Sequence, residues 1–206
     1  MIDRIQWLGH GSFRIEGSPL TYINPWRIAR SAFHADLILI SSDQYEHCSP
    51  ADVEKLCGPD TVVVANAEAA AALGGDVVVL RPWQCFNVGA ARITAVPAYT
   101  YSHHHPVSQG GLGFIISLGY YDIYYAGLTD VVPELMHIRA DIAILPVGAG
   151  QGTMNTERAA DFVRQMQPSH VIPSHWGTIS GTNLDVQAFV RALDGQTNVM
   201  AFEKNR

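Results

Sequence analysis

Short apolar segments alternate with helical segments along the whole chain, and this alternation constrains the fold most strongly. Residues 37–40, 61–65 and 141–146 have the composition of buried strands, whereas residues 155–167 carry apolar side chains at helical spacing. Strands and helices interspersed in this way are typical of an α/β fold. Clusters of strands at the start and in the middle of the chain predict two mixed sheets rather than one parallel sheet. We therefore expect residues 1–206 to form one α/β domain.

Capping residues indicate where further helices begin. Ser49 and Pro50 predict a helix start, because serine caps helix N-termini and proline fits the first helical turn. Residues 67–73, 131–138 and 184–193 are also expected to be helical. Neither a low-complexity tract nor an internal repeat interrupts this pattern, which favours a single domain.

Composition argues against several function classes. Hydrophobic residues make up 48% of the 206 residues and charged residues 16%, which is too apolar for a disordered chain. The formal net charge of −6 argues against a nucleic-acid groove, since such a groove needs a basic stripe. We expect no membrane span, because no apolar run reaches about 18 residues.

Cysteine usage predicts a reducing compartment. Cys48, Cys57 and Cys85 are odd in number and widely spaced, and they form no CxxC pair. Three reduced thiols in a cytoplasmic protein are therefore expected. Residues 1–5 do not combine a basic segment with a following apolar one, so we expect no secretory signal.

Polar residues collect directly after several of the predicted strands. Four such loops, residues 41–47, 99–106, 126–130 and 173–178, would meet in one cleft if their strands end at the same edge. Histidine is the commonest protein metal ligand. The chain has nine histidines, at positions 10, 34, 47, 103, 104, 105, 137, 170 and 175. The loops and the histidine count together favour a metal-binding cleft.

Six segments resemble motifs of the metallo-β-lactamase superfamily, in its branch of metal-dependent hydrolases similar to ascorbate-6-phosphate lactonase. In chain order they read WLGHGSFRIE (7–16), YINPW (22–26), GLGFII (111–116), YAG (125–127), LPVG (145–148) and IPSHWGT (172–178). Their shared order supports the resemblance over nearly the whole chain. It implies a four-layer αββα sandwich of two mixed β-sheets flanked by helices. It also implies a site between the sheets that binds two metal ions, usually zinc.

The sequence departs from the family at the positions of metal ligands. Where related proteins commonly have SHDHYDH, this chain has SSDQYEH, so that Ser42, Gln44 and Glu46 replace two histidines and an aspartate. Leu128 stands where the family has a metal-bridging aspartate, and Asn24 stands where it has a supporting aspartate. The resemblance therefore identifies this chain as a degenerate member of the family.

The remaining ligands favour at most one metal ion. Without a bridging carboxylate, a dinuclear site is not expected, because two dications ~3.5–4 Å apart repel each other. Glu46, His47 and His175 still form a mononuclear set for zinc or manganese. His105 aligns with the family's mid-chain ligand, although the alignment leaves His103 and His104 as alternatives. A protein that binds no metal ion is as consistent with this sequence as one that binds a single ion.

The first functional hypothesis is a mononuclear metal-dependent hydrolase of a small ester, lactone or phosphoester. Its metal would activate a water molecule and polarise a carbonyl or phosphoryl oxygen. Asp43 or Asp130 would then serve as the general base. A small molecule, with a negative charge as one possibility, is the expected partner, and assembly into a homo-oligomer is left open.

Two alternatives remain. The first is a catalytically inactive family member that binds a small anionic ligand or a partner protein, because the ligand positions are substituted. The second is metal-free chemistry with Ser42 or Cys48 as nucleophile and His105 or His47 as base. His10 is expected in a turn at the end of a strand, and a role in lining the site is the less favoured reading.

Overall fold

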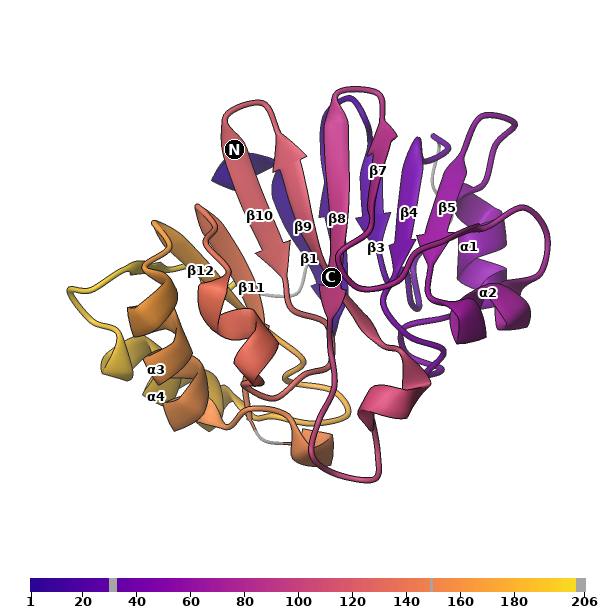
Figure 1. The fold of residues 1–206 in the computed structure, drawn as a ribbon. Helices are drawn as coiled ribbons and strands as arrows, with labels where there is room; N and C mark the ends of the chain where they lie inside the picture. Colours follow the sequence, from indigo (N-terminus) through magenta and orange to yellow (C-terminus); the bar gives the residue numbers. More distant parts are fainter. Residues whose placement is uncertain (30–32, 149, 203–206) are drawn as a thin grey trace.

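Two mixed β-sheets form the centre of the structure, a computed structural model that describes residues 1–29, 33–148 and 150–202 (Figure 1). In the first sheet, the strands follow one another in chain order. The first three pair antiparallel, and the third to the sixth pair parallel. These strands are β1 (Ile5–Gly9), β2 (Ser12–Ile15), β3 (Thr21–Ile23), β4 (Leu37–Ile40), β5 (Val62–Ala65) and β6 (Val78–Val79).

The second sheet is also mixed, with the order β13-β12-β11-β10-β9-β8-β7. Strands β7 to β10 pair antiparallel, and β10 to β13 pair parallel. The strands are β7 (Cys85–Val88), β8 (Ala91–Pro97), β9 (Leu112–Leu118), β10 (Tyr121–Tyr125), β11 (Ile142–Pro146), β12 (His170–Ser174) and β13 (Asn198–Val199). The predicted pair of mixed sheets is therefore confirmed.

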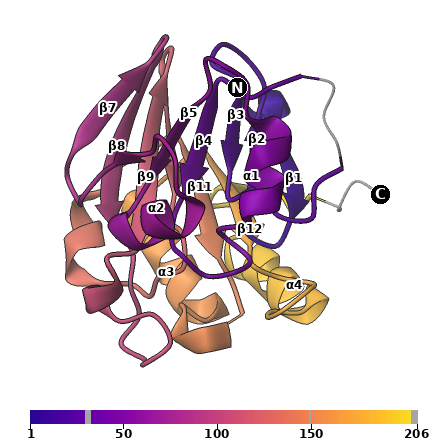
Figure 2. The ribbon, with the colours of Figure 1, turned by 90° about the vertical axis from the view of Figure 1, so that its right-hand side faces the viewer.

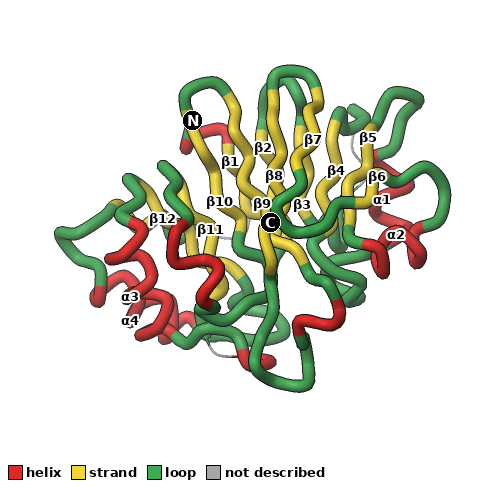
Figure 3. The backbone as a smooth tube through the Cα atoms, viewed as in Figure 1, coloured by secondary structure: helices red, strands yellow, loops and turns green. Residues whose placement is uncertain are grey.

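Helices lie beside each sheet (Figure 3). The α-helices are α1 (Pro50–Leu56), α2 (Ala67–Leu73), α3 (Thr156–Met166) and α4 (Asn183–Ala192), and the 3-10 helices are η1 (Ile2–Arg4), η2 (Val107–Gln109), η3 (Pro133–His137) and η4 (Gly150–Gly152). As the capping residues predict, the Ser49 side chain accepts a hydrogen bond from the Asp52 N–H at the start of α1. In the described part of the chain, every helix is too short or too polar to cross a membrane.

The helix predicted over residues 131–138 is wrong in type and extent. The structure has only the 3-10 helix η3 there, and Val132 before it is extended, with φ −108° and ψ 153°. The physical reason is Pro133, because proline disfavours helical backbone in the residue that precedes it.

Three apolar clusters show that the elements form four layers. The cluster between the sheets contains Phe13 of β2 and Ile144 of β11. A second cluster joins the second sheet to Phe162 of α3 and Phe189 of α4, and a third joins the first sheet to Leu56 of α1. Figure 2 shows β1 to β4 and β7 to β9 on opposite sides of the turned molecule. The layers are thus helix, sheet, sheet and helix, as the resemblance implied.

Candidate metal centre

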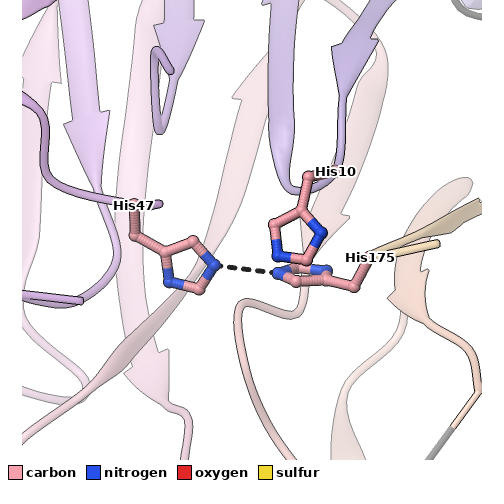
Figure 4. Close-up of side chains that lie close together, drawn as sticks. All are labelled: His10, His47 and His175. Atoms are coloured by element: carbon pink, nitrogen blue, oxygen red, sulfur yellow. Dashed lines mark hydrogen bonds between the residues drawn. The ribbon is translucent and has the colours of Figure 1, made fainter. Parts of the chain in front are cut away.

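Three buried histidines from separate loops come together at one edge of the two sheets (Figure 4). His10 lies in the turn between β1 and β2, His47 in the loop that follows β4, and His175 directly after β12. One potential ligand atom from each ring lies within 4.8 Å of the others. Both sheets therefore contribute side chains to a group with the composition of a metal site.

The backbone at this edge adopts conformations that are rare for residues with side chains. His10, Asn24 and His175 have φ angles of 51°, 44° and 58°, in the left-handed region. Each such residue costs roughly 1–2 kcal/mol, and such conformations cluster at functional sites. The His10 carbonyl accepts hydrogen bonds from the His175 N–H (3.0 Å) and from Trp7 Nε1 (2.9 Å). The bond from His175 ties the first β-hairpin to the end of β12, and the bond from Trp7 lies within the hairpin.

A hydroxyl group lies at hydrogen-bond distance from the Nδ1 atom of each histidine. The pairs are Thr178 Oγ1 with His10 (3.1 Å), Ser42 Oγ with His47 (2.8 Å) and Ser174 Oγ with His175 (2.9 Å). The Nε2 atoms of His47 and His175 are 2.9 Å apart, and His10 Nε2 is buried without a hydrogen-bond partner among the described residues. The hydroxyl groups thus hold each ring from its Nδ1 side, so that the Nε2 atoms face the centre of the cluster.

The three imidazoles are neutral at pH 7. Burial lowers the pKa of His10 to about 4. It also lowers the pKa of His47 and of His175 well below 6.5, and the neighbouring His10 lowers both further. Neutral imidazole is the form that binds metal ions, so metal binding needs no net loss of protons from the imidazoles; the proton between His47 Nε2 and His175 Nε2 has only to move to an Nδ1 atom.

The donor set fits a divalent metal ion. Two nitrogen ligands of tetrahedral zinc lie roughly 3.3 Å apart, given a zinc–nitrogen bond of about 2.0–2.1 Å. The 2.9 Å between His47 Nε2 and His175 Nε2 differs from this by a few tenths of an ångström. The buried, unpartnered Nε2 of His10 supplies a third donor. Three protein ligands with a fourth position for water are typical of catalytic zinc sites.

The structure brings His47 and His175 together but not the other two expected ligands. Glu46 is buried, yet it is outside the group of converging ligand atoms among the described residues, whereas His10 belongs to that group. His105 Nδ1 lies 3.1 Å from Gln109 Oε1, and its ring packs closely against Gly111. His105 therefore braces the loop that leads into β9.

From the sequence, His10 was not assigned as a ligand. His10 belongs to the segment 7–16, which resembles a family motif that carries no metal ligand. The sequence did carry a usable signal. His10 directly follows a strand that ends at Gly9, as the polar loops of the predicted cleft follow their strands. The same criterion that singled out residues 41–47 and 173–178 would have included it.

The two predicted general bases differ in their surroundings. Asp130 is buried, with Oδ2 2.6 Å from Arg158 Nη1 and Oδ1 accepting a hydrogen bond of 2.7 Å from the Val131 N–H. Both its oxygens are engaged, which makes it a structural ion-pair partner rather than a base. Asp43 is exposed on the same loop as His47, and no ion pair to it occurs among the described residues.

The two predicted nucleophiles of a metal-free mechanism also differ. Burial raises the pKa of the Cys48 thiol to about 11, so that it stays protonated and unreactive at neutral pH. Its Sγ lies 3.9 Å from the carbonyl oxygen of Ala69. Ser42, by contrast, contacts the predicted base His47. Of the two, only the serine has a partner suited to this chemistry.

A network of neutral polar groups lies next to the histidine cluster, and its member Ser41 has its Oγ atom 3.4 Å from His47 Nδ1. Asn24 Nδ2 donates to Ser41 Oγ (2.7 Å) and to Tyr125 Oη (2.8 Å), and Asn24 Oδ1 accepts from the Ser41 N–H (2.8 Å). Tyr125 Oη in turn donates to the carbonyl of Gly11 (2.8 Å). Because a carbonyl can only accept, Tyr125 must accept from Asn24. The network therefore requires an amide, not a carboxylate, at position 24.

Adjacent tyrosines of β10 provide a test of this network. Tyr125→Phe should lower the free energy of unfolding by about 2 kcal/mol, since it leaves the Gly11 carbonyl and one Asn24 N–H unpaired. Tyr124→Phe removes a buried hydroxyl that has no partner among the described residues, and should leave stability unchanged or raise it by about 1 kcal/mol. Urea unfolding of both variants measures the difference, and equal effects would contradict the assigned hydrogen bonds.

Comparisons with known proteins agree with this architecture. A profile of the beta-lactamase superfamily domain matches residues 4–175. A UPF0173 metal-dependent hydrolase of Pyrococcus abyssi is 28% identical over 218 residues, covering 97% of this chain and 96% of that protein. One from Thermoplasma acidophilum is 27% identical over 208 residues, covering 93% and 91%. A candidate metal-dependent hydrolase from Parabacteroides distasonis, of known structure, has a TM-score of 0.85 at 26% identity, covering 95% and 90%.

Proposed function

Because this chain belongs to the β-lactamase superfamily and has the fold of its metal-dependent hydrolases, we propose that it is a hydrolase that uses one divalent metal ion, zinc or manganese. The ligands are His10, His47 and His175. The observation that carries this proposal is the convergence of three buried, neutral imidazoles, each supported at Nδ1 by a hydroxyl group.

The proposal is restricted to one metal ion by the residues at the other ligand positions of the family. Ser42 Oγ already has His47 Nδ1 as its hydrogen-bond partner. Leu128 places a buried apolar side chain where the bridging carboxylate is expected. An apolar group cannot offset the repulsion of two dications. His105 Nε2 is also buried without a partner among the described residues, but it packs against Gly111 and lies outside the group of converging ligand atoms.

The bound metal would lower the pKa of a water molecule and polarise a carbonyl or phosphoryl oxygen of the substrate. The protein supports this chemistry by orienting its ligands. With the metal bound, each imidazole would carry its proton on Nδ1, where the hydroxyls of Ser42, Ser174 and Thr178 can accept it, and the Nε2 lone pairs would face the metal. We propose the exposed Asp43 as proton acceptor. The proposed substrates are small esters, lactones or phosphoesters.

One observation favours a second candidate function, an inactive family member that binds a small anionic ligand. The hydrogen bond between His47 Nε2 and His175 Nε2 satisfies both rings within the protein. A cluster that is stable in this form has less need of a metal ion. We also propose a cytoplasmic location, which the three unpaired cysteines support.

Reconstitution of metal-free protein tests the proposed function. After treatment with EDTA, zinc and manganese are offered separately, and the hydrolysis of a chromogenic ester, a lactone and a phosphoester is measured. We expect one of these activities to return with about one equivalent of metal, and His175→Ala to remain inactive. Activity that survives EDTA would contradict the proposal, and metal binding without activity towards any substrate would favour the inactive member.

Removal of the Ser42 hydroxyl should weaken metal binding without removing a ligand. Ser42→Ala deprives His47 Nδ1 of its 2.8 Å partner, and loss of such outer contacts typically costs 10–100-fold in metal affinity. The stoichiometry should not change at saturating metal. Competition with a chromophoric chelator measures the affinity. An affinity equal to that of the wild type would show that Ser42 does not position His47.

A further inference from the structure

Arg27 presents a cationic group close to the histidine cluster, and no carboxylate among the described residues forms an ion pair with it. Its side chain is exposed, and the guanidinium carbon lies 4.4 Å from the centroid of the Trp26 ring. The described residues include no ion pair to Arg27, although the chain has six more acidic than basic residues. The ring and the guanidinium attract each other, which holds the side chain in place.

The backbone of Arg27 is fixed by a carboxylate that is not available to its side chain. Arg27 has a φ of 52°, and its N–H donates to Asp52 Oδ2 (2.8 Å). The same oxygen accepts from Ser49 Oγ (2.8 Å), and Oδ1 pairs with Lys55 Nζ (2.7 Å). Asp52 thus contacts the backbone of Arg27, and no ion pair between a carboxylate and the guanidinium occurs among the described residues, so its N–H donors can bind another anion.

Trp26 connects this cation to the candidate metal centre. The ring of Trp26 lies edge-on to the His10 ring, with centroids 5.9 Å apart, and edge-on to Tyr45, with centroids 5.6 Å apart. Because Arg27 and His10 contact the same ring, the guanidinium lies within about 10 Å of the His10 imidazole. A small organic molecule spans this distance. Tyr45 is 61% exposed and lies on the loop that carries His47, so it borders the same region.

We propose that Arg27 binds a carboxylate or phosphate group of the substrate while the bond to be hydrolysed lies at His10, His47 and His175; this inference rests on the proposed function. The planar guanidinium binds both kinds of anion through paired hydrogen bonds. The three ligands are histidines rather than carboxylates, so they add no negative charge that would repel an anionic substrate. The substrate class is thereby narrowed to small esters, lactones or phosphoesters that carry an additional anionic group.

Anion binding to the metal-free protein tests the role of Arg27 independently of catalysis. Inorganic phosphate and benzoate are titrated separately by calorimetry at constant ionic strength, so that the two arms distinguish phosphate from carboxylate. We expect at least one to bind, with an affinity about tenfold or more lower in Arg27→Gln. Arg27→Lys should lie between the two, because it keeps the charge but not the planar donor pair.

Arg14 provides a matched control. Its guanidinium also lies over an aromatic ring, that of Tyr22 at 5.9 Å, but it pairs with Glu16. Arg14→Gln should therefore leave anion affinity unchanged. The inference is overturned if the wild type binds neither anion, or if Arg14→Gln and Arg27→Gln weaken binding equally. Thermal unfolding verifies that each variant is folded.

A kinetic measurement separates failure of this inference from failure of the proposed function. In the zinc-loaded protein, Arg27→Gln should raise KM at least tenfold for an ester with a carboxylate group and leave KM unchanged for the neutral ester of the same alcohol. Equal KM effects on both esters would overturn the role of Arg27 and leave the hydrolase proposal intact. Arg27-dependent anion binding without any hydrolysis would instead support the anion site and contradict the hydrolase.

Discussion

Replacement of Asn24 by aspartate is expected to destabilise the metal-free protein by about 3 kcal/mol at pH 8. Asn24 is fully buried and donates two hydrogen bonds, to Ser41 Oγ and Tyr125 Oη. An ionised aspartate donates neither, and Tyr125 cannot turn its own proton toward position 24 without leaving the Gly11 carbonyl unpaired. The substitution changes one atom of the side chain, so the loss reports on charge and hydrogen-bond direction rather than on size.

The destabilisation should depend on pH. Burial and the loss of donors raise the pKa of the new carboxyl group above that in the unfolded chain, about 3.9. Its protonated form can donate one of the two lost bonds. The variant is therefore most stable, relative to the wild type, below the unfolded pKa, and loses stability as the pH rises through the folded pKa. Urea unfolding in EDTA at pH 5 and pH 8 measures the difference from the wild type.

Asn155 offers a matched control for this substitution. It is exposed, and its side chain only accepts a hydrogen bond, from the Arg158 N–H at the start of α3. Aspartate caps helices as well as asparagine does, so Asn155→Asp should change the free energy of unfolding by less than about 0.5 kcal/mol. A similar small effect of Asn24→Asp would show that the amide at position 24 does not organise the site.

A methyl group added at Gly11 is expected to reduce metal affinity about 100-fold without removing a ligand. A Cβ atom on Gly11 would lie 2.7 Å from His175 Nε2 and 3.1 Å from Tyr125 Oη. Either the His175 ring or the first hairpin must then move by several tenths of an ångström. Such a shift takes His175 Nε2 away from the other two donors, and metal sites tolerate little displacement of this kind.

Gly177→Ala is the control for Gly11→Ala. Gly177 lies two residues after His175, and apart from its chain neighbours no described residue has an atom within 4 Å of an added Cβ. Its φ of 76° makes alanine cost roughly 1–2 kcal/mol of stability, yet the ligand positions should not change. Metal affinity is measured for both variants by competition with a chromophoric chelator. If Gly11→Ala binds metal as tightly as Gly177→Ala, His175 Nε2 is not a ligand.

Local sequence signals predicted most of the secondary structure. Strand β4 and helix α2 occur at the predicted residues 37–40 and 67–73, because a run of aliphatic residues and an alanine-rich segment ended by glycine are unambiguous on their own. The helix predicted over residues 131–138 is instead a 3-10 helix at residues 133–137, because Pro133 disfavours helical backbone at Val132. The arrangement in two sheets followed from the family resemblance as well as from the strand pattern.

The site was less predictable because it joins loops that are far apart in the sequence. His47 and His175 were expected together, and their Nε2 atoms are 2.9 Å apart. The contribution of His10 depends on how the first hairpin meets the end of β12, through the hydrogen bond of the His175 N–H to the His10 carbonyl. Glu46 was included among the predicted metal ligands only because it aligns with a ligand position of the family. An alignment gives the order of the ligands along the chain but not the direction of their side chains.

The metal content of the purified chain, produced without a histidine tag and offered zinc and manganese, tests the central claim most directly. We predict about one metal ion per chain, lost in His10→Ala and retained in Glu46→Gln, because His10 and not Glu46 belongs to the converging group. Two metal ions per chain, or none, would contradict the account. So would a single ion that is retained in His10→Ala and lost in Glu46→Gln.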